Sequence, residues 1–177
     1  MILTRIDITS PFYYEAYNLY QDAFPLIERR DLKEHLRVLS QNNYHFSVML
    51  ENDKFIGIML YFESESFIYL EHFAVLPSLR KQGYGSKALE LLKQNGKTVI
   101  LEIEFPCDEI TNKRLAFYEK NGFKLTEHYH IQPKYRVDDV DLPLKILSYP
   151  TKISNIEYLT FKEFLDNNVS IFRKWNK

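Results

Sequence analysis

Two glycines, Gly83 and Gly85, stand one residue apart between a strand-like run at Phe67–Val75 and a helix-like run at 87–93. The chain has only five glycines, so their clustering here needs a physical reason. Glycine tolerates a positive φ and lets a ligand approach the backbone closely. A helix that opens just after such a turn directs free N–H groups and its positive dipole end at one spot. The spacing therefore predicts either a phosphate-binding turn or a plain strand-to-helix turn.

Length and charge restrict the classes of protein to which this chain can belong. Its 177 residues suffice for one domain with a sizeable core and are few for two. Lysine and arginine total 23 against 24 aspartate and glutamate, for a net charge of −1. A chain this balanced has no strong field to gather nucleic acid or membrane lipid, so we expect neither as a partner.

The cysteine and histidine content and the hydropathy pattern argue against a disulfide-linked, zinc-binding, secreted or membrane-spanning protein. The one cysteine, Cys107, cannot form an intramolecular disulfide, and the five histidines show no zinc-ligand spacing, so we expect no metal. The residues after Met1 lack the apolar core of a signal peptide, and no apolar run is long enough to span a bilayer. We expect a cytoplasmic protein in which Cys107 is a packed or loop thiol.

Hydrophobic periodicity and turn residues predict both strands and helices along the chain. Strands are expected at residues 2–8, 44–51, 55–62, 66–75, 98–104, 123–131 and 140–149. Helices are expected at residues 13–23, 28–40, 86–95, 111–121 and 160–174. Residues 52–54 signal a hairpin turn, Gly96 and Gly122 are expected helix ends, and Thr160 with Glu163 forms a capping-box pattern. This order predicts a single α/β domain over residues 1–177.

Two sequence blocks resemble the GNAT superfamily of acyl-CoA-dependent N-acyltransferases. The first, Arg-Lys-Gln-Gly-Tyr-Gly-Ser at 80–86, follows Phe-Ala-Val-Leu-Pro at 73–77 and resembles the family's pyrophosphate turn. The second, Asn-Lys-Arg-Leu-Ala-Phe-Tyr-Glu-Lys-Asn-Gly-Phe at 112–123, resembles its late helix. The resemblance is clearest over 44–130 and implies a mixed, mostly antiparallel central sheet, splayed at the acyl-CoA site and flanked by helices. It also implies transfer of an acetyl group from acetyl-CoA to a primary amine by direct attack.

The resemblance assigns cofactor contacts residue by residue. Backbone groups of three strand residues are expected to pair with the pantetheine arm, and the turn and helix start are expected to hold the pyrophosphate. Together these residues are Phe73, Ala74, Val75, Arg80, Lys81, Gly83, Tyr84, Gly85, Ser86 and Asn112. The alternative for Arg80 and Lys81 is a pair of solvated loop charges. Many family members carry asparagine where Thr111 stands here, so Asn112 is either a cofactor contact or a residue of the helix N-terminus.

Glu71 interrupts an apolar strand and is the first candidate catalytic residue. With a period of two it should share a face with Tyr69, Phe73 and Val75, while His72 points to the opposite face and packs or hydrogen bonds there. A carboxylate on a covered strand is costly unless it is paired, and it can take up a proton near neutral pH. The resemblance implies that Glu71 deprotonates the amine, directly or through water. The alternative is an ion pair with a neighbouring lysine or arginine.

Tyr118 lies in the second block and is the candidate general acid. Acyl transfer from CoA expels a thiolate, which needs a proton or a strong hydrogen-bond donor, and a buried tyrosine hydroxyl can supply it. The resemblance assigns that role to Tyr118. The alternative is an amphipathic core tyrosine, an ordinary role in a chain with 13 tyrosines.

The acceptor side carries the weakest sequence signal. The resemblance implies that the first two helices and the final strands enclose it, and these segments supply Phe24, Glu28 and Tyr129. Aromatic walls with one carboxylate suit a compact cationic amine, so we expect a small-molecule or peptide amine as the acceptor. The alternative places Phe24 and Tyr129 in the core and pairs Glu28 with a helix arginine. A monomer or a homodimer is expected.

Two other classes of function fit this sequence less well. A domain of the same fold that binds acyl-CoA as a sensor or interaction module, without turnover, would need neither Glu71 nor Tyr118. Thiol release from acetyl-CoA with pooled amines would distinguish it from an enzyme. A dinucleotide-binding fold fits poorly, because the preceding strands form a hairpin series and Ala88 stands where Gly-x-Gly-x-x-Gly has its third glycine.

Overall fold

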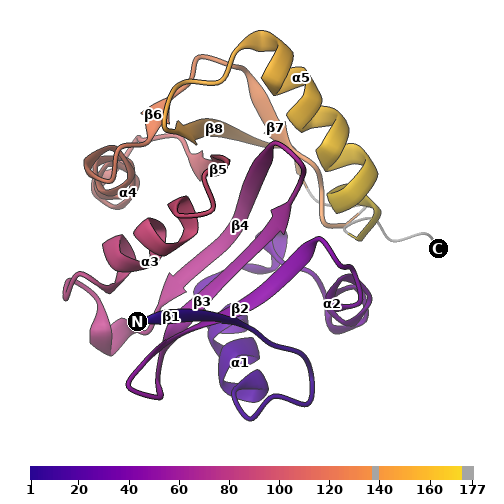
Figure 1. Cartoon of the computed structure of the whole chain (residues 1–177). Helices are drawn as coiled ribbons and strands as arrows, with labels where there is room; N and C mark the ends of the chain where they lie inside the picture. The colour runs from indigo at the N-terminus through magenta and orange to yellow at the C-terminus, as the bar shows by residue number, and fades with distance from the viewer. Residues whose placement is uncertain (137–139, 173–177) are drawn as a thin grey trace. The chain divides into compact units, whose positions relative to one another are not determined.

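The computed structural model describes residues 1–136 and 140–172. The chain divides into two compact units, the first made of Met1–Pro25 and Leu39–Val99 and the second of Leu26–Val38 and Ile100–Lys177. Both units combine strands with helices (Figure 1). This mixture is the α/β composition that the sequence predicts.

The first unit contains an antiparallel sheet of four strands, which lie side by side in their order along the chain. The strands are β1 (Ile2–Arg5), β2 (Tyr44–Glu51), β3 (Lys54–Glu63) and β4 (Phe67–Val75). Asn52 and Asp53 connect β2 to β3 with φ values of 50° and 59°, the left-handed backbone of a two-residue hairpin turn. The predicted hairpin is therefore confirmed, whereas β1 is shorter than the predicted strand at 2–8.

Two helices pack on this sheet, and its central strands are buried along most of their length. Helix α1 (Tyr13–Ala23) contacts β3 and β4, and α3 (Tyr84–Lys93) contacts β1 and β4. Nearly every residue of β2 and β3 is buried, which is typical of strands covered on both faces. The end of β4 and the start of α3 therefore lie on a rigid framework.

Strand β4 contains a β-bulge at Glu71. Leu60 of β3 pairs with His72, but the next residue, Tyr61, pairs with Leu70. Glu71 is therefore the extra residue of the bulge. A bulge of this kind bends a strand and changes the direction of the side chains that flank it.

The bulge overturns two expectations about the neighbours of Glu71. A period of two places Tyr69 on the face of Phe73, but the extra residue puts Tyr69 on the opposite face, so that expectation is wrong. The side chains of Glu71 and His72 were expected to point apart. Instead, His72 Nδ1 lies 3.6 Å from Glu71 Oε2.

The strands of the second unit centre on β8 (Leu142–Tyr149). Strand β8 lies between β5 (Thr98–Glu104) and β6 (Lys124–Leu125) in the strand order, and β7 (His130–Gln132) also pairs with it. The single strand predicted at 123–131 is therefore wrong. Strands β6 and β7 pair with opposite ends of β8, since Leu125 lies opposite Leu147 and His130 lies opposite Leu144.

Helix boundaries differ from the predicted ones mainly where a side chain caps the first turn. Helix α2 (Leu32–Leu39) begins later than residue 28, because the Asp31 carboxylate accepts a hydrogen bond from Glu34 N at 2.7 Å. Leu26–Glu28 form a separate 3₁₀ turn, η1. Helix α4 (Glu109–Lys120) begins earlier than residue 111, because Asp108 forms a capping box with Thr111.

The last long helix, α5 (Asn155–Phe164), shows the largest error in the predicted helix starts. Its capping box is formed by Ser154 and Glu157, and the predicted box at Thr160 and Glu163 is wrong. The Thr160 hydroxyl instead donates to Ile156 O inside the helix. A π turn at Leu165–Val169 and a 3₁₀ turn at Ser170–Phe172 follow, and the predicted helix end at 173–174 lies outside the described residues.

Replacing the observed cap tests this boundary. Ser154→Ala should lower the free energy of unfolding by about 1 kcal/mol, because the side chain no longer accepts the Glu157 amide. Thr160→Ala is the matched control and should change it by less than ~0.5 kcal/mol, because alanine favours the helix interior. Urea denaturation of the three proteins measures both. An equal or larger loss in Thr160→Ala would contradict the assigned start of α5.

Candidate functional site

The turn between β4 and α3 has the backbone of an anion-binding helix start. Gly83 precedes the helix with a φ of 84°, and Lys81 adopts a φ of 63°. A Cβ on Gly83 would meet no atom within 4 Å, so glycine is needed for its conformation rather than for space. Within the described residues, no side chain caps the first turn of α3. Its first amides, from Tyr84 onward, are therefore available to a ligand.

The same turn is tied to the end of β4. Arg80 Nε donates to Val75 O at 3.2 Å, so the guanidinium is held where the strand ends. Lys87 adds a second cation, with its Nζ 5.3 Å from the centre of the Tyr84 ring and 3.2 Å from Glu51 Oε1. The first unit thus brings together the strand end, the turn and the helix start to which the sequence assigned cofactor binding.

Glu71 is buried beside an aromatic cluster in the same unit. Its side chain is 1% exposed, although the residue as a whole is only half-buried because its backbone is more open. His72 packs edge-on against Tyr20 and Phe24, with ring centres 5.0 and 4.6 Å apart. Phe24 is half-buried and packs on His72 in this cluster.

Tyr118 lies in α4, in the second unit, with its ring packed edge-on against Phe117 and Phe123. Burial raises the pKa of Tyr118 to about 12, with Arg114 opposing the shift and Glu104 adding to it. The hydroxyl therefore keeps its hydrogen throughout the neutral range. It can donate a hydrogen bond or a proton, and it is not a base.

Glu28 lies in the 3₁₀ turn η1 near the same charged pair. Burial, followed by the charge of Glu104, raises the pKa of Glu28, while Arg114 opposes the shift and Glu102 adds to it. Glu104 and Arg114 are themselves ion-paired. Glu104 and Arg114 therefore act electrostatically on both Glu28 and Tyr118.

Two predicted residues are placed less favourably for a ligand. The Asn112 amide is exposed and donates to Asp108 O at 2.6 Å, which is the helix N-terminus alternative rather than a free amide. The Tyr129 side chain is 74% exposed, so it is not a core residue. Its carbonyl oxygen instead accepts a hydrogen bond from the Tyr158 hydroxyl at 2.7 Å.

The structure also reveals a buried polar cluster that the sequence did not single out. Glu102 Oε1 lies 2.5 Å from His130 Nε2, and His130 Nδ1 lies 3.2 Å from the Tyr158 hydroxyl. The side chains of Glu102 and His130 are 7% and 1% exposed. The sequence held one signal for this cluster. Glu102 and Glu104 alternate with apolar residues in a predicted strand, which places both carboxylates on one face of it.

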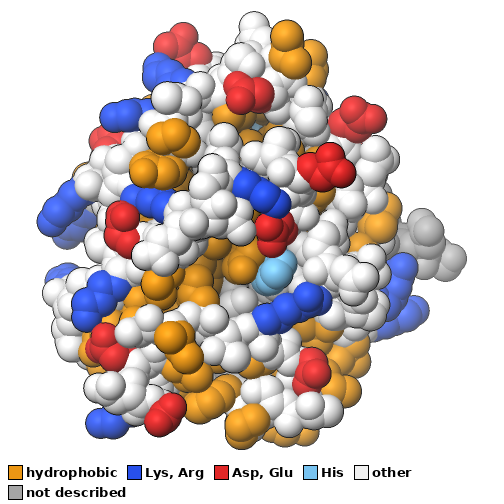
Figure 2. Space-filling model, in the orientation of Figure 1, with side chains coloured by type: hydrophobic (Ala, Val, Ile, Leu, Met, Phe, Trp, Pro, Cys, Tyr) orange, Lys and Arg blue, Asp and Glu red, His pale blue; other side chains and the backbone are white. Residues whose placement is uncertain are grey.

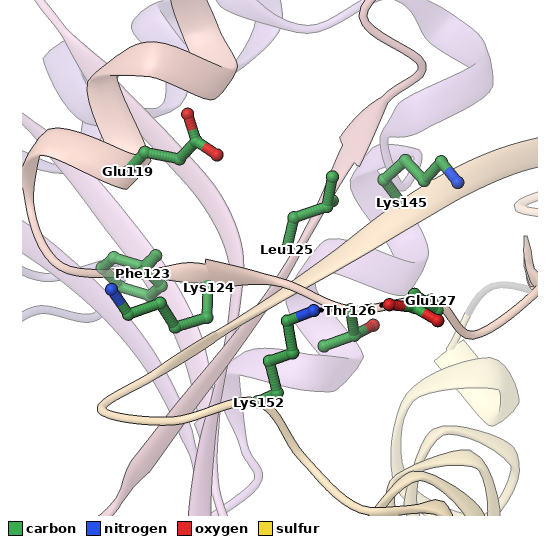
Figure 3. Close-up of a pocket in the computed structure, with 8 residues that line it drawn as sticks. All are labelled: Glu119, Phe123, Lys124, Leu125, Thr126, Glu127, Lys145 and Lys152. Atoms are coloured by element: carbon green, nitrogen blue, oxygen red, sulfur yellow. Dashed lines mark ion pairs between the residues drawn. The ribbon is translucent and has the colours of Figure 1, made fainter.

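A shallow cleft of about 480 Å³ elsewhere in the second unit holds none of the predicted site residues. It is lined by Glu119, Phe123, Lys124, Leu125, Thr126, Glu127, Lys145 and Lys152. Figure 3 shows that the ammonium groups of its lysines point in different directions, with Lys152 turned toward Glu127 at 3.5 Å. These cations do not converge on one ligand position.

Residues 1–136 and 140–172 contain no group of three or more histidine, cysteine or acidic side chains arranged to hold a metal ion. None of the helices over those residues has the length and hydropathy needed to cross a bilayer.

Comparison with known proteins identifies the family. Residues 13–123 match the family model described as "Acetyltransferase (GNAT) family". The chain belongs to this family. The match runs from α1 to the end of the second sequence block and includes the glycine turn, so the resemblance carried by these blocks is confirmed.

Individual relatives agree with this family. Over 114 residues the chain is 32% identical to a Bacillus subtilis (strain 168) protein named "Putative acetyltransferase YjbC", a match that covers 61% of this chain and 56% of that protein. The match thus spans little more than half the length of that relative. A solved GNAT-family protein from Bacteroides thetaiotaomicron is 29% identical with a TM-score of 0.89, covering 96% and 98% of the two chains.

A third comparison concerns the fold alone. A solved aminoglycoside 6′-N-acetyltransferase in complex with coenzyme A has a TM-score of 0.60 at 17% identity, covering 88% of this chain and all of that one. With the family model and the Bacteroides structure, it confirms the predicted single-domain α/β fold with a mixed, mostly antiparallel sheet flanked by helices.

Proposed function

We propose that this protein transfers an acetyl group from acetyl-CoA to a primary amine. The observation that carries the proposal is the turn after β4. There this chain, a member of the GNAT family, has a helix start without a side-chain cap, next to Arg80 and Lys81. Amide groups and cations at such a point suit the pyrophosphate of CoA. The aminoglycoside acetyltransferase of similar fold, solved with coenzyme A, supports the choice of cofactor.

The cofactor would be held by the residues that the sequence assigned to it. Backbone groups of Phe73, Ala74 and Val75 would pair with the pantetheine arm. The pyrophosphate would contact the turn and helix start, namely Arg80, Lys81, Gly83, Tyr84, Gly85 and Ser86. Asn112 is the weakest member of the set, because its amide already bonds Asp108 O.

The chemistry needs a proton donor for sulfur and a proton acceptor for nitrogen. The amine nitrogen attacks the thioester carbonyl carbon, a C–N bond forms and the C–S bond breaks. Tyr118, whose hydroxyl stays protonated, gives a proton to the departing thiolate. Glu71 takes a proton from the amine nitrogen, directly or through water. No metal enters this reaction scheme.

The acceptor would be a small-molecule or peptide amine. Glu28 and Tyr129 supply a carboxylate and an exposed aromatic ring for a cationic amine, whereas Phe24 is engaged with His72. Acidic and basic side chains are interspersed on the face in Figure 2, which favours a compact ligand over a nucleic acid. A cytoplasmic location and a monomeric or homodimeric state stay predictions.

An amine panel tests the function as a whole. Thiol release from acetyl-CoA should rise with at least one of polyamines, aminoglycosides, amino acids or peptide N-termini, and the product should carry an N-acetyl group by mass spectrometry. Glu28→Gln should raise KM for a cationic acceptor about tenfold, whereas Glu127→Gln, at an exposed site, should not. CoA binding without thiol release for any amine would instead favour the non-catalytic acyl-CoA sensor.

The glycine turn can be tested by CoA binding alone. Gly85→Asp adds a side chain and a negative charge at the start of α3, so we expect CoA affinity to fall at least about tenfold, or roughly 1.4 kcal/mol. Gln94→Glu, at the C-terminal end of the same helix with a φ of −61°, is the control for the added charge. Calorimetry on folded variants measures both. Unchanged affinity in Gly85→Asp would remove the pyrophosphate assignment.

The catalytic assignments can be tested by kinetics. Tyr118→Phe should lower kcat about 10²-fold with CoA affinity nearly unchanged, because the hydroxyl acts on the departing thiolate. Glu71→Gln should lower kcat by a similar factor. Tyr149→Phe removes a hydroxyl that the proposed reaction does not use and serves as the control. Wild-type kcat in both site variants would refute these roles even if the protein acetylates amines.

A further inference from the structure

The 3₁₀ turn η1 carries Glu28, the carboxylate proposed to bind the ammonium group of the acceptor. Apolar burial does little to fix this turn, because Leu26 is 62% exposed and Ile27 and Glu28 are only half-buried. A backbone hydrogen bond from Arg29 N to Leu26 O closes the turn, at a long 3.4 Å. The turn therefore needs partners elsewhere in the chain to keep one position.

Gln132 of β7 is the first of these partners. Its Nε2 donates to Ile27 O, the carbonyl just before Glu28, at 3.5 Å. Gln132 is 8% exposed and lies opposite Leu142 where β7 pairs with β8. A buried amide on a paired strand has little freedom to turn away, so this bond ties η1 to the strands of the second unit.

Arg136 is the second partner and holds two carbonyl groups at once. Its Nη1 donates to Leu26 O, and its Nη2 donates to Arg29 O at 3.5 Å. The planar guanidinium has donors in a rigid fork that can span two acceptors, whereas the compact ammonium of a lysine matches this geometry poorly. The two carbonyls stand on either side of Glu28 in the chain. The bonds of Arg136 therefore bracket that residue.

A cation–π contact joins the same two segments of the chain. The guanidinium carbon of Arg30 lies 5.7 Å from the centre of the Tyr135 ring, and both residues are 3% exposed. A guanidinium that has lost its water is attracted to a ring face. Residues 26–30 and 132–136 are thus linked by contacts at several points, although about a hundred residues separate them in sequence.

The environment of Glu28 gives this link a purpose. Burial, followed by the charge of Glu104, raises the pKa of Glu28. Both effects make the carboxylate more stable in water than where it lies, so a loose turn would let it move outward. The hydrogen bonds to the neighbouring carbonyls oppose that movement without using the carboxylate itself, which stays available to a ligand.

We propose that Gln132 and Arg136, here called the η1 clamp, are positioning residues that fix Glu28 for the ammonium group of the acceptor. The inference rests on the proposed transfer to a cationic amine. Both residues act through the backbone of η1. A binding group that is ordered before its ligand arrives makes binding less costly. The clamp should therefore affect KM for the acceptor rather than kcat or KM for acetyl-CoA.

The clamp can be tested without any substrate. Arg136→Lys keeps the charge but loses the fork of donors, and Gln132→Leu keeps the approximate size but cannot donate. In both variants the pKa of Glu28, followed by ¹³C NMR of its carboxyl group, should fall toward the ordinary value of about 4.3. Lys134→Met, which removes a nearby cation paired with Asp141 at 3.1 Å, should leave it unchanged. Wild-type titration of Glu28 in both clamp variants would contradict the proposal.

The role in the reaction should appear as a split between kinetic constants. Gln132→Leu and Arg136→Lys should each raise KM for a cationic amine about fivefold, with kcat and KM for acetyl-CoA within about twofold of the wild type. Lys134→Met should match the wild type in all three constants. A large fall in kcat, or an equal rise in both KM values, would indicate a general structural defect and refute the positioning role.

A double variant tests whether the clamp acts through Glu28. Glu28→Gln removes the charge that the clamp positions, so adding Gln132→Leu to it should raise KM for the amine by less than about twofold further. A full fivefold rise in the Glu28→Gln background would show that Gln132 acts by another route, and the proposal would fail.

These outcomes are distinct from failure of the proposed function. Wild-type KM for the amine in folded Gln132→Leu and Arg136→Lys would overturn the clamp and leave the acetyltransferase assignment standing. Wild-type protein that acetylates no amine in the panel would refute the proposed function itself, and with it the role of the clamp in acceptor binding.

Discussion

The close approach of β3 and β4 at Gly57 is the contact on which the candidate cofactor site depends. A Cβ at this position would lie 2.2 Å from Ala74 O and 2.9 Å from Val75 Cα, closer than side chains are found. Only glycine lets the two backbones come so near. Arg80 then bonds Val75 O, so the orientation of the turn follows from where β4 ends. Gly57, which lies in β3, therefore helps to position the glycine turn between β4 and α3.

The two units contribute different kinds of chemistry. The first offers backbone amides and cations at a helix start, which suit an anionic group, together with the buried carboxylate of Glu71. The second concentrates buried titratable side chains, from the protonated hydroxyl of Tyr118 to the Glu102–His130 pair. Burial suits the Tyr118 hydroxyl to its proposed role, because it raises the pKa of the phenol and keeps it protonated.

The sequence predicted elements with strong periodicity more accurately than their ends. Helix α1, strand β2 and strand β5 have the predicted bounds. The start of α5 was misplaced because Ser154 and Thr160 both begin a Ser/Thr-x-x-Glu pattern, and local sequence cannot choose between them. Packing decides, since a helix from Asn155 buries both Tyr158 and Phe161. The strand at 123–131 failed for a related reason, because its split depends on which part of β8 each half reaches.

The sequence by itself determined the family, the glycine turn and the candidate roles of Glu71 and Tyr118, because these follow from residue types at short, regular spacing. Only the tertiary structure revealed the bulge at Glu71, which arises from the register of two strands. It alone also brought Glu102, His130 and Tyr158 together, each 28 residues from the next. Residues so far apart in the chain leave no pattern in the local sequence, because their contacts form only when the strands and α5 have packed.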